Sequence, residues 1–313
     1  LAHDAGIPCV SFATAASMNG YASANVAPTL AGVKSLLRAR PPHAVLASPE
    51  ILCAAPRELT TAGLGDVLAK CTSSADWRMN HLLFGDYYCA RSVGLIVEIE
   101  PLYLEHPEAV AAGDARAVGA LFDALLRTGV AMTMAESSAP ASGGEHLISH
   151  TLDMLAVAAG GEHDLHGRQV GVGTILMCEL YRRVLAVESP KFRAPPATID
   201  ARFWGKLAGA VAPCYAEKRP RLAVAAGALA KAGAWDRLRA ELAPMLRPPE
   251  QVRDCLARAG GATTASDIGC DKRALAEILR RAREVRARFT ILDLADLLGI
   301  LDAAAGEIVQ QWG

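Results

Sequence analysis

Three histidines in segment 142–173 constrain the structure of this chain more than any other feature. His146 and His150 are four residues apart, and His166 stands at the head of a second apolar, helix-like pattern. Residues four apart lie on one face of a helix, so both imidazoles of the pair can point into one cleft. A third imidazole from another segment, together with one carboxylate, would complete a divalent-metal site with an open coordination position.

The candidate carboxylate lies much earlier in the chain, at Asp66. It follows Gly63-Leu64-Gly65, which we interpret as a glycine turn that opens a long helix and presents the carboxylate. We therefore expect Asp66, His146 and His166 to hold one catalytic metal. Zinc is the default ion for two imidazoles and a carboxylate, and nickel or iron fits the same ligands.

Neighbouring residues offer alternatives around this site. His163 lies three residues before His166 and competes with it for the third position, although its glycine-rich surroundings also suit a solvated histidine. Glu145 is adjacent to His146 and would point elsewhere on a helix. Asp153 is better placed to accept a hydrogen bond from an imidazole N–H.

The overall composition excludes several kinds of partner. The 313 residues carry a net charge of −1 with 5% aromatic residues, so nothing favours nucleic acid or an acidic membrane surface. No run approaches the roughly 18 apolar residues that span a bilayer. The 8 cysteines include no Cys-x-x-Cys pair, which suggests buried thiols in a reducing compartment. We expect a soluble cytoplasmic protein of about two domains.

The beginning of the chain has the pattern of an α/β unit. Residues 7–12 predict a short buried strand, and residues 44–47 predict another. Residues 26–34 look extended, with a turn near Ala31 and Gly32. The loop 13–23 is rich in small and hydroxyl side chains, and a loop that follows a strand in an α/β sheet is a usual ligand-binding position.

The pattern changes near residue 50, where we place a domain boundary. Residues 1–50 form the α/β part, and residues 51–313 are mostly Ala/Leu/Arg/Glu-rich helical pattern broken by glycine and proline. One helix break is expected at Pro213. The basic run 280–288 predicts the end of a helix 272–288 with one exposed basic face.

Five motifs follow one another along the chain: ATAASMNGYASAN, GLGDVLAK, SGGEHLISHTLD, LHGRQVGVGTI and RFTILDLADLLGIL. Together they resemble the sn-glycerol-1-phosphate dehydrogenases, which belong with glycerol dehydrogenase, the iron-containing alcohol dehydrogenases and dehydroquinate synthase. The resemblance covers most of residues 7–190 and returns near the C-terminus. It implies a dehydroquinate-synthase-like two-domain fold, α/β plus all-α, whose C-terminal domain is a helical array.

The resemblance also implies roles for individual residues. Asp66, His146 and His166 match the family's metal ligands, and Asp66 thereby also contacts substrate. His150 matches a histidine that contacts substrate and passes a proton. Asn19 falls where family members often have an aspartate that touches substrate. The contacts to the NAD or NADP cofactor match Thr14, Ala15, Ala16, Ser17 and Ser23.

One part of the family pattern has no counterpart here. Family members begin with a Rossmann-like half that carries a glycine-rich phosphate loop, and no segment of this chain matches that loop. We therefore expect residues 1–50 to be the C-terminal remnant of an incomplete dinucleotide-binding domain, ahead of the metal- and substrate-binding domain at 51–313.

The resemblance implies a metal-dependent NAD(P)-linked oxidoreductase that interconverts glycerone phosphate and sn-glycerol 1-phosphate, assembled as a homodimer or larger homo-oligomer. Lys218, Arg219 and Arg221 are candidate partners for the phosphate. Three alternatives stay open. Glycerol dehydrogenase differs only in whether a phosphate is bound, a dehydroquinate-synthase-like cyclase would carry glutamate in place of Asp66, and a truncated helical assembly protein would have no catalysis.

Overall fold

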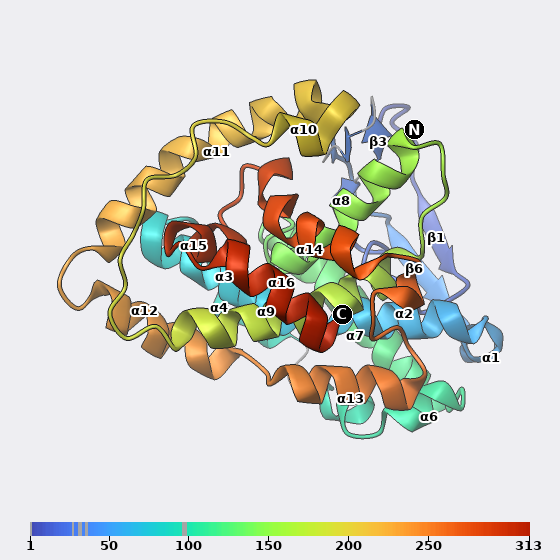
Figure 1. Ribbon diagram of the computed structural model, residues 1–313. Coiled ribbons are helices and arrows are strands. Elements are labelled where there is room, and N and C mark those ends of the chain that lie inside the picture. Colours follow the sequence, from blue (N-terminus) through green and yellow to red (C-terminus); the bar gives the residue numbers. More distant parts are fainter. Residues whose placement is uncertain (1, 27, 31–32, 35–36, 96–98) are drawn as a thin grey trace.

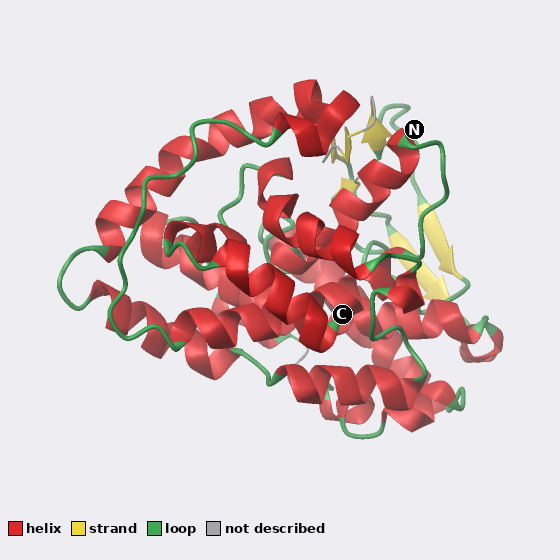
Figure 2. Cartoon of the chain, viewed as in Figure 1, coloured by secondary structure: helices red, strands yellow, loops and turns green. Residues whose placement is uncertain are grey.

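The computed structural model describes residues 2–26, 28–30, 33–34, 37–95 and 99–313. The strands gather at one edge of the molecule, and helices make up the rest (Figure 1, Figure 2). The described strands all precede residue 48, and the first helix begins at Pro49. The division into two domains near residue 50 stays a prediction.

The strands form three separate pairs. β1 runs parallel to β6, whereas β2 pairs antiparallel with β5 and β3 with β4. The bounds are β1 Val10–Ala13, β2 Asn25–Val26, β3 Thr29–Leu30, β4 Val33–Lys34, β5 Leu37–Arg38 and β6 Ala44–Ala47. The turn expected near Ala31 and Gly32 lies outside the described residues.

The prediction of a buried strand at residues 7–12 was wrong about its burial. β1 begins at Val10, and the side chains of Val10 and Phe12 are 58% and 53% exposed. A parallel strand is buried when neighbouring strands and helices cover it. Within the described part of the chain, β1 pairs with β6 alone, so the apolar side chains of this two-stranded sheet remain open.

The helices follow from residue 49 to residue 312. The first are α1 Pro49–Ala54, α2 Arg57–Leu68, α3 Lys70–Phe84, α4 Ala90–Gly94, α5 Pro101–Leu104, α6 Pro107–Ala111, α7 Ala115–Met134, α8 Gly144–Ala158 and α9 His166–Leu185. The later ones are α10 Ala201–Trp204, η1 Gly205–Leu207, α11 Ala208–Leu229, α12 Ala234–Leu242, η2 Ala243–Met245, α13 Pro249–Ala259, η3 Ser266–Ile268, α14 Lys272–Arg281, η4 Ala282–Val285, α15 Ile291–Leu297 and α16 Leu301–Trp312.

Helix α9 is the centre of the helical part. It packs against α2, α8, α13, α15 and α16, and nearly all of its side chains are buried. The contact with α2 is unusually close because glycines face each other. A Cβ atom on Gly65 would lie 2.1 Å from the Gly167 carbonyl oxygen, and a Cβ on Gly167 would lie 1.9 Å from the Ala62 carbonyl oxygen. Only glycine permits this approach of the two backbones.

Two expected helix boundaries were wrong. Pro213 does not end a helix, because α11 runs through both Pro213 and Pro220. An interior proline removes one N–H donor and crowds the preceding turn, yet the turns around both prolines are helical here. The basic run does not continue a helix to residue 288. α14 ends at Arg281, a short 3-10 turn follows, and Arg286 is already in an extended conformation.

Among the described residues, helix α7 meets the length and composition of a membrane-crossing helix. It spans Ala115–Met134, and 61% of its apolar 18-residue window is buried inside the fold, so the expectation of no membrane span is not overturned. Core helices of the same length and composition have this burial.

Candidate metal centre and active-site cavity

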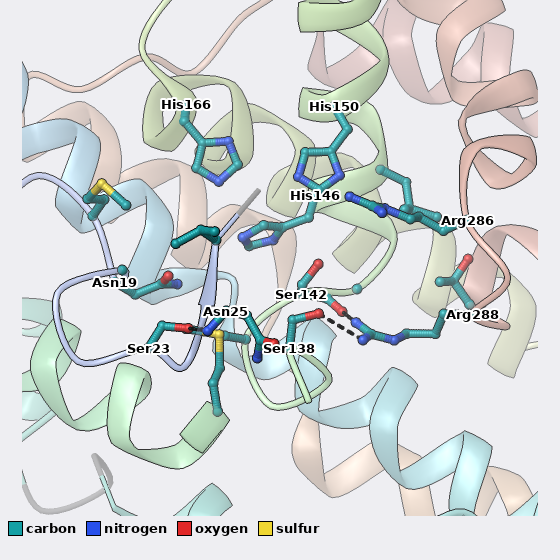
Figure 3. Close-up of a pocket in the computed structure, with 18 of the residues that line it drawn as sticks. Asn19, Ser23, Asn25, Ser138, Ser142, His146, His150, His166, Arg286 and Arg288 are labelled. Carbon is teal, nitrogen blue, oxygen red and sulfur yellow. Dashed lines mark hydrogen bonds between the residues drawn. The ribbon is translucent and has the colours of Figure 1, made fainter. Parts of the chain in front are cut away.

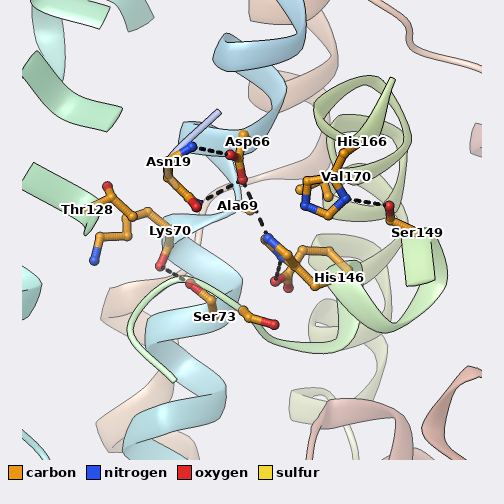
Figure 4. Close-up of polar contacts among 12 residues, drawn as sticks. Asn19, Asp66, Ala69, Lys70, Ser73, Thr128, His146, Ser149, His166 and Val170 are labelled. Atoms are coloured by element: carbon orange, nitrogen blue, oxygen red, sulfur yellow. Dashed lines mark hydrogen bonds and ion pairs between the residues drawn. The ribbon is translucent and has the colours of Figure 1, made fainter. Parts of the chain in front are cut away.

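The three predicted metal ligands converge from three different helices. Asp66 comes from α2, His146 from α8 and His166 from the first position of α9. Their candidate ligand atoms all lie within 4.8 Å of one another, and Asp66 and His146 are buried (Figure 4). His146 Nε2 lies 3.4 Å from Asp66 Oδ1. Two imidazoles and a carboxylate at these separations suit a divalent metal.

Asp66 reaches this position in a way that differs from the prediction. Residues 63–66 are not a turn at the start of a helix but lie inside α2, so the glycine-turn interpretation was wrong. The two glycines instead let α2 approach its neighbours. A Cβ on Gly63 would lie 1.9 Å from the Ala16 carbonyl oxygen, and Gly65 faces Gly167. This packing brings Asp66 beside His166, one residue before Gly167.

The imidazole of His146 is held in place by the carboxylate of Glu145, which lies on the side of the ring opposite Asp66. Its Nδ1 donates to Glu145 Oε1 at 2.9 Å, while the Glu145 carboxylate also accepts from Thr72 Oγ1 at 2.7 Å and from the Gly143 N–H at 2.6 Å. Glu145 thus positions the imidazole with Nε2 toward Asp66, as the partners of metal-binding histidines do. Sequence reasoning assigned no such role to Glu145.

The pKa of His146 reflects these two carboxylates. Burial alone would lower the pKa, but hydrogen bonds and charges from Asp66 and Glu145 outweigh burial and raise it to about 9. Metal binding requires the neutral imidazole, so an ion at this site replaces a proton that Asp66 otherwise stabilises.

His166 is oriented by hydrogen bonds with uncharged side chains. The Ser149 hydroxyl donates to Gln169 Oε1 at 2.7 Å and lies 2.8 Å from His166 Nδ1. A hydroxyl has one proton, so Ser149 accepts from the Nδ1–H of His166. The Nε2 lone pair of His166 is then the one available to a metal.

Asn19 fixes the remaining ligand. Its backbone N–H donates to Asp66 Oδ2 at 2.8 Å, and its side-chain Nδ2 donates to Asp66 Oδ1 at 3.0 Å (Figure 4). The loop after β1 therefore orients the carboxylate of α2. Asn19 was expected to touch substrate, and it also lines the cavity described next.

An open cavity of about 520 Å³ lies against the three histidines (Figure 3). His146, His150 and His166 line it, and their ring centroids are 5.1–6.2 Å apart. His150 is buried and sits one helical turn after His146 on α8. A cavity of this volume suits a small organic ligand or part of a larger one.

Comparison with known sequences bears on the identity of this site. The iron-containing alcohol dehydrogenase pattern matches residues 1–56. The glycerol-1-phosphate dehydrogenase [NAD(P)+] of Geobacillus thermodenitrificans is 31% identical over 91% of this chain and 65% of its own length. That of Pyrococcus furiosus is 42% identical over 56% of this chain and 50% of its own length. The resemblance to the glycerol-1-phosphate dehydrogenases is confirmed.

Comparison with solved structures shows the fold of the chain. A probable glycerol dehydrogenase from Sinorhizobium meliloti superposes with a TM-score of 0.58 over 97% of this chain and 72% of its own, at 18% identity. An NADH-dependent butanol dehydrogenase A from Thermotoga maritima gives 0.54 over 98% and 66%, at 14% identity. The expected fold, with its helical array, is confirmed. The chain spans 65% of the length of the first-matched glycerol-1-phosphate dehydrogenases.

The residues that the glycerol-1-phosphate dehydrogenase resemblance assigned to cofactor contact do not all reach the cavity. Ser23 lines it, and its Oγ accepts from the Asn25 N–H at 3.0 Å. Thr14 is exposed, Ser17 is half-buried, and the side chains of Ala15 and Ala16 are buried. Their contact with a nicotinamide cofactor stays a prediction.

The competing candidates lie elsewhere. His163 is partly exposed, and its Nδ1 lies 3.1 Å from Asp153 Oδ1. The Asp153 carboxylate thus forms an ion pair with the imidazole of His163. Its expected hydrogen bond to a metal-binding imidazole stays a prediction. Among the described residues, His163 is not part of the group that brings three ligand atoms together.

Two arginines of this chain were not assigned to the site by the sequence analysis. Arg286 and Arg288 line the cavity beside the histidines. They belong to the basic run 280–288, which was interpreted as an exposed helical face. Both residues come after the end of α14 and the short 3-10 turn that follows it, so neither lies on the expected helical face.

Proposed function

We propose that this chain provides the metal- and substrate-binding part of a cytoplasmic NAD(P)-linked oxidoreductase that interconverts glycerone phosphate and sn-glycerol 1-phosphate. The observation that carries the proposal is the convergence of Asp66, His146 and His166 beside an open cavity that the two histidines line. The names of the relatives in two separate groups of organisms support the same substrate.

The three side chains fit a divalent metal by their donor chemistry. Glu145 and Ser149 occupy Nδ1 of the two imidazoles, so each Nε2 is directed to the same place as the Asp66 carboxylate. Zinc suits this set, and nickel or iron accepts the same donors. Such an ion supplies Lewis-acid polarisation of the C2 carbonyl of the substrate when it is bound.

The remaining predicted site residues act on the substrate, on the ligand Asp66 or on the cofactor. His150 holds the proton that the C2 oxygen takes up when the carbonyl is reduced, and it accepts that proton in the reverse direction. Asn19 keeps the Asp66 carboxylate oriented through its two hydrogen bonds. The loop residues Thr14, Ala15, Ala16, Ser17 and Ser23 would contact the nicotinamide cofactor.

The metal content of the purified protein tests this function. After incubation with zinc, nickel or iron and removal of excess ion, we expect about one ion per wild-type chain. Asp66→Ala and His146→Ala should each lose it. His106→Ala, which replaces a largely exposed histidine beside Glu108, should keep it. Circular dichroism checks that all variants are folded.

If the wild-type chain binds no metal after incubation with excess zinc, nickel or iron, the oxidoreductase proposal is refuted. The chain would then be better described as a helical assembly protein with the fold of a dehydrogenase. Retention of the ion in Asp66→Ala would instead place the metal at another set of ligands.

A further inference from the structure

We propose that Arg286, supported by Arg288, binds the phosphate group of the substrate at the end of the cavity beside His150. The inference rests on the proposed function, since it assigns the part of the site that distinguishes a phosphorylated triose from free glycerol. The same chemistry would bind any small phosphate monoester, so the experiment below compares ligands with and without that group.

The charge of the cavity points to an anion. Arg286 and Arg288 both line it, and no aspartate or glutamate is among the described residues of its lining. In Figure 3 the guanidinium of Arg286 points toward His150. Arginine presents a planar fork of donors that matches phosphate oxygens, and its bonds to phosphate are among the strong hydrogen bonds of proteins.

Arg286 has its donors available. It makes no hydrogen bond or ion pair with any residue in the described part of the chain, although it is half-buried. Burial lowers its pKa. A half-buried guanidinium without a protein acceptor is costly unless a ligand supplies the acceptor. A phosphate in the cavity would supply it.

We assign Arg288 a different role from Arg286, because its N–H donors already bond to protein oxygens. It donates to the Ser142 carbonyl oxygen and, at 2.9 Å, to Ser138 Oγ, both in the loop before α8 (Figure 3). These bonds fix its guanidinium at the cavity wall. Burial and the neighbouring Arg286 lower the pKa of Arg288 to about 10, so it remains charged at neutral pH. We assign it a positioning and electrostatic role.

The basic residues that the sequence offered for the phosphate are engaged elsewhere. Lys218 pairs with Asp293 at 2.9 Å in the core, Arg221 pairs with Asp86 at 2.5 Å, and exposed Arg219 donates to the Ala197 carbonyl oxygen. The three do not line the cavity that contains the histidines. Arg286 is therefore the better candidate within the described chain.

Isothermal titration of the zinc-incubated protein tests the assignment with three probes: inorganic phosphate, sn-glycerol 1-phosphate and glycerol. Arg286→Gln should weaken binding of the two phosphate-bearing probes by about 10- to 100-fold, the loss expected for one charge-assisted contact. Its affinity for glycerol and its zinc content should not change. Arg219→Gln is the matched control and should behave as wild type.

Two outcomes with Arg286→Gln contradict the inference. Unchanged phosphate affinity in Arg286→Gln overturns it, and so does an equal loss for glycerol, which would indicate a damaged cavity. Should Arg286→Gln be unfolded, Arg286→Lys replaces it, because lysine keeps the charge and loses the fork. Intermediate phosphate affinity is then expected, and wild-type affinity overturns the assignment.

The two proposals fail separately. If the chain binds zinc and Arg286→Gln has the phosphate affinity of wild type, the proposed oxidoreductase function stands and the phosphate subsite is refuted. A chain without zinc that still binds inorganic phosphate through Arg286 loses the function and keeps the anion site.

Discussion

At the scale of single residues, the site shows how buried charges depend on their partners. His146 forms ion pairs with Asp66 and Glu145, so the buried charges of the metal centre compensate one another. Lys70 lies one turn beyond Asp66 and lacks this compensation. It is 6% exposed, and the acceptor of its Nζ is the neutral Pro140 carbonyl oxygen at 3.0 Å.

Lys70 should make the stability of the protein depend on pH. Burial lowers its pKa from 10.5 to about 8. Between these values the unfolded chain binds the proton more tightly, so the cost of burying Lys70 is complete below pH 8 and is relieved as the pH rises toward 10.5. The full cost is about 3 kcal/mol.

The substitution Lys70→Met tests this linkage. At pH 7 the variant should be more stable than wild type, because Ser73 Oγ still donates to the Pro140 carbonyl oxygen. Its advantage in the free energy of unfolding should shrink by about 2 kcal/mol between pH 7 and pH 9.5. Urea unfolding at both pH values measures the difference. Lys231→Met, at an exposed position, serves as control, and a constant advantage for Lys70→Met would refute the argument.

At the scale of elements, the site depends on how closely α2 and α9 approach. Gly65→Ala would place a methyl group 2.1 Å from the Gly167 backbone oxygen, which cannot rotate away. Overpacking of this kind costs about 1–3 kcal/mol. We expect a lower melting temperature and, because the separation of Asp66 from His166 grows, weaker metal binding.

Gly119→Ala is the matched control for this effect. Gly119 lies in α7 with no atom within 4 Å of an added Cβ, so alanine should stabilise the helix by about 0.5–1 kcal/mol. Thermal unfolding followed by circular dichroism compares the two variants. A Gly65→Ala protein as stable as Gly119→Ala would show that the helices can separate without loss.

The contact between Gly65 and Gly167 shows which features of the helices the sequence does not predict. The four-residue spacing of His146 and His150 predicts a shared helical face, and His166 does begin α9, because both depend on local periodicity. The environment of Gly65 depends on Gly167, about a hundred positions away, so local pattern suggested a turn instead. Arg286 was missed for a similar reason, since its surroundings come from distant segments.

At the scale of the whole molecule, the cavity joins the strand-containing beginning of the chain to the helical remainder. Asn19 bonds to Asp66, and the Ala24 N–H donates to Thr133 Oγ1 on α7 at 3.1 Å. The loop after β1 is therefore fastened to the helices on both sides of the site. The homo-oligomer that the family resemblance implies stays a prediction.

Metal binding should consequently stabilise the entire fold. Asp66, His146 and His166 lie on helices separated by up to a hundred residues of chain, and the unfolded chain does not hold them together. An ion at 100 times its dissociation constant stabilises the folded state by about 2.7 kcal/mol if it does not bind the unfolded chain.

Thermal unfolding with increasing zinc measures this linkage. The melting temperature of wild type should rise with the zinc concentration and fall back when a chelator is added. Thiolates are zinc ligands, so binding of zinc to any of the 8 cysteines in the unfolded chain would oppose the effect. His166→Ala keeps every cysteine and removes one ligand, so the difference between the two proteins isolates the site. A parallel rise in both proteins would mean that the ion stabilises the chain from somewhere other than the junction of α2, α8 and α9.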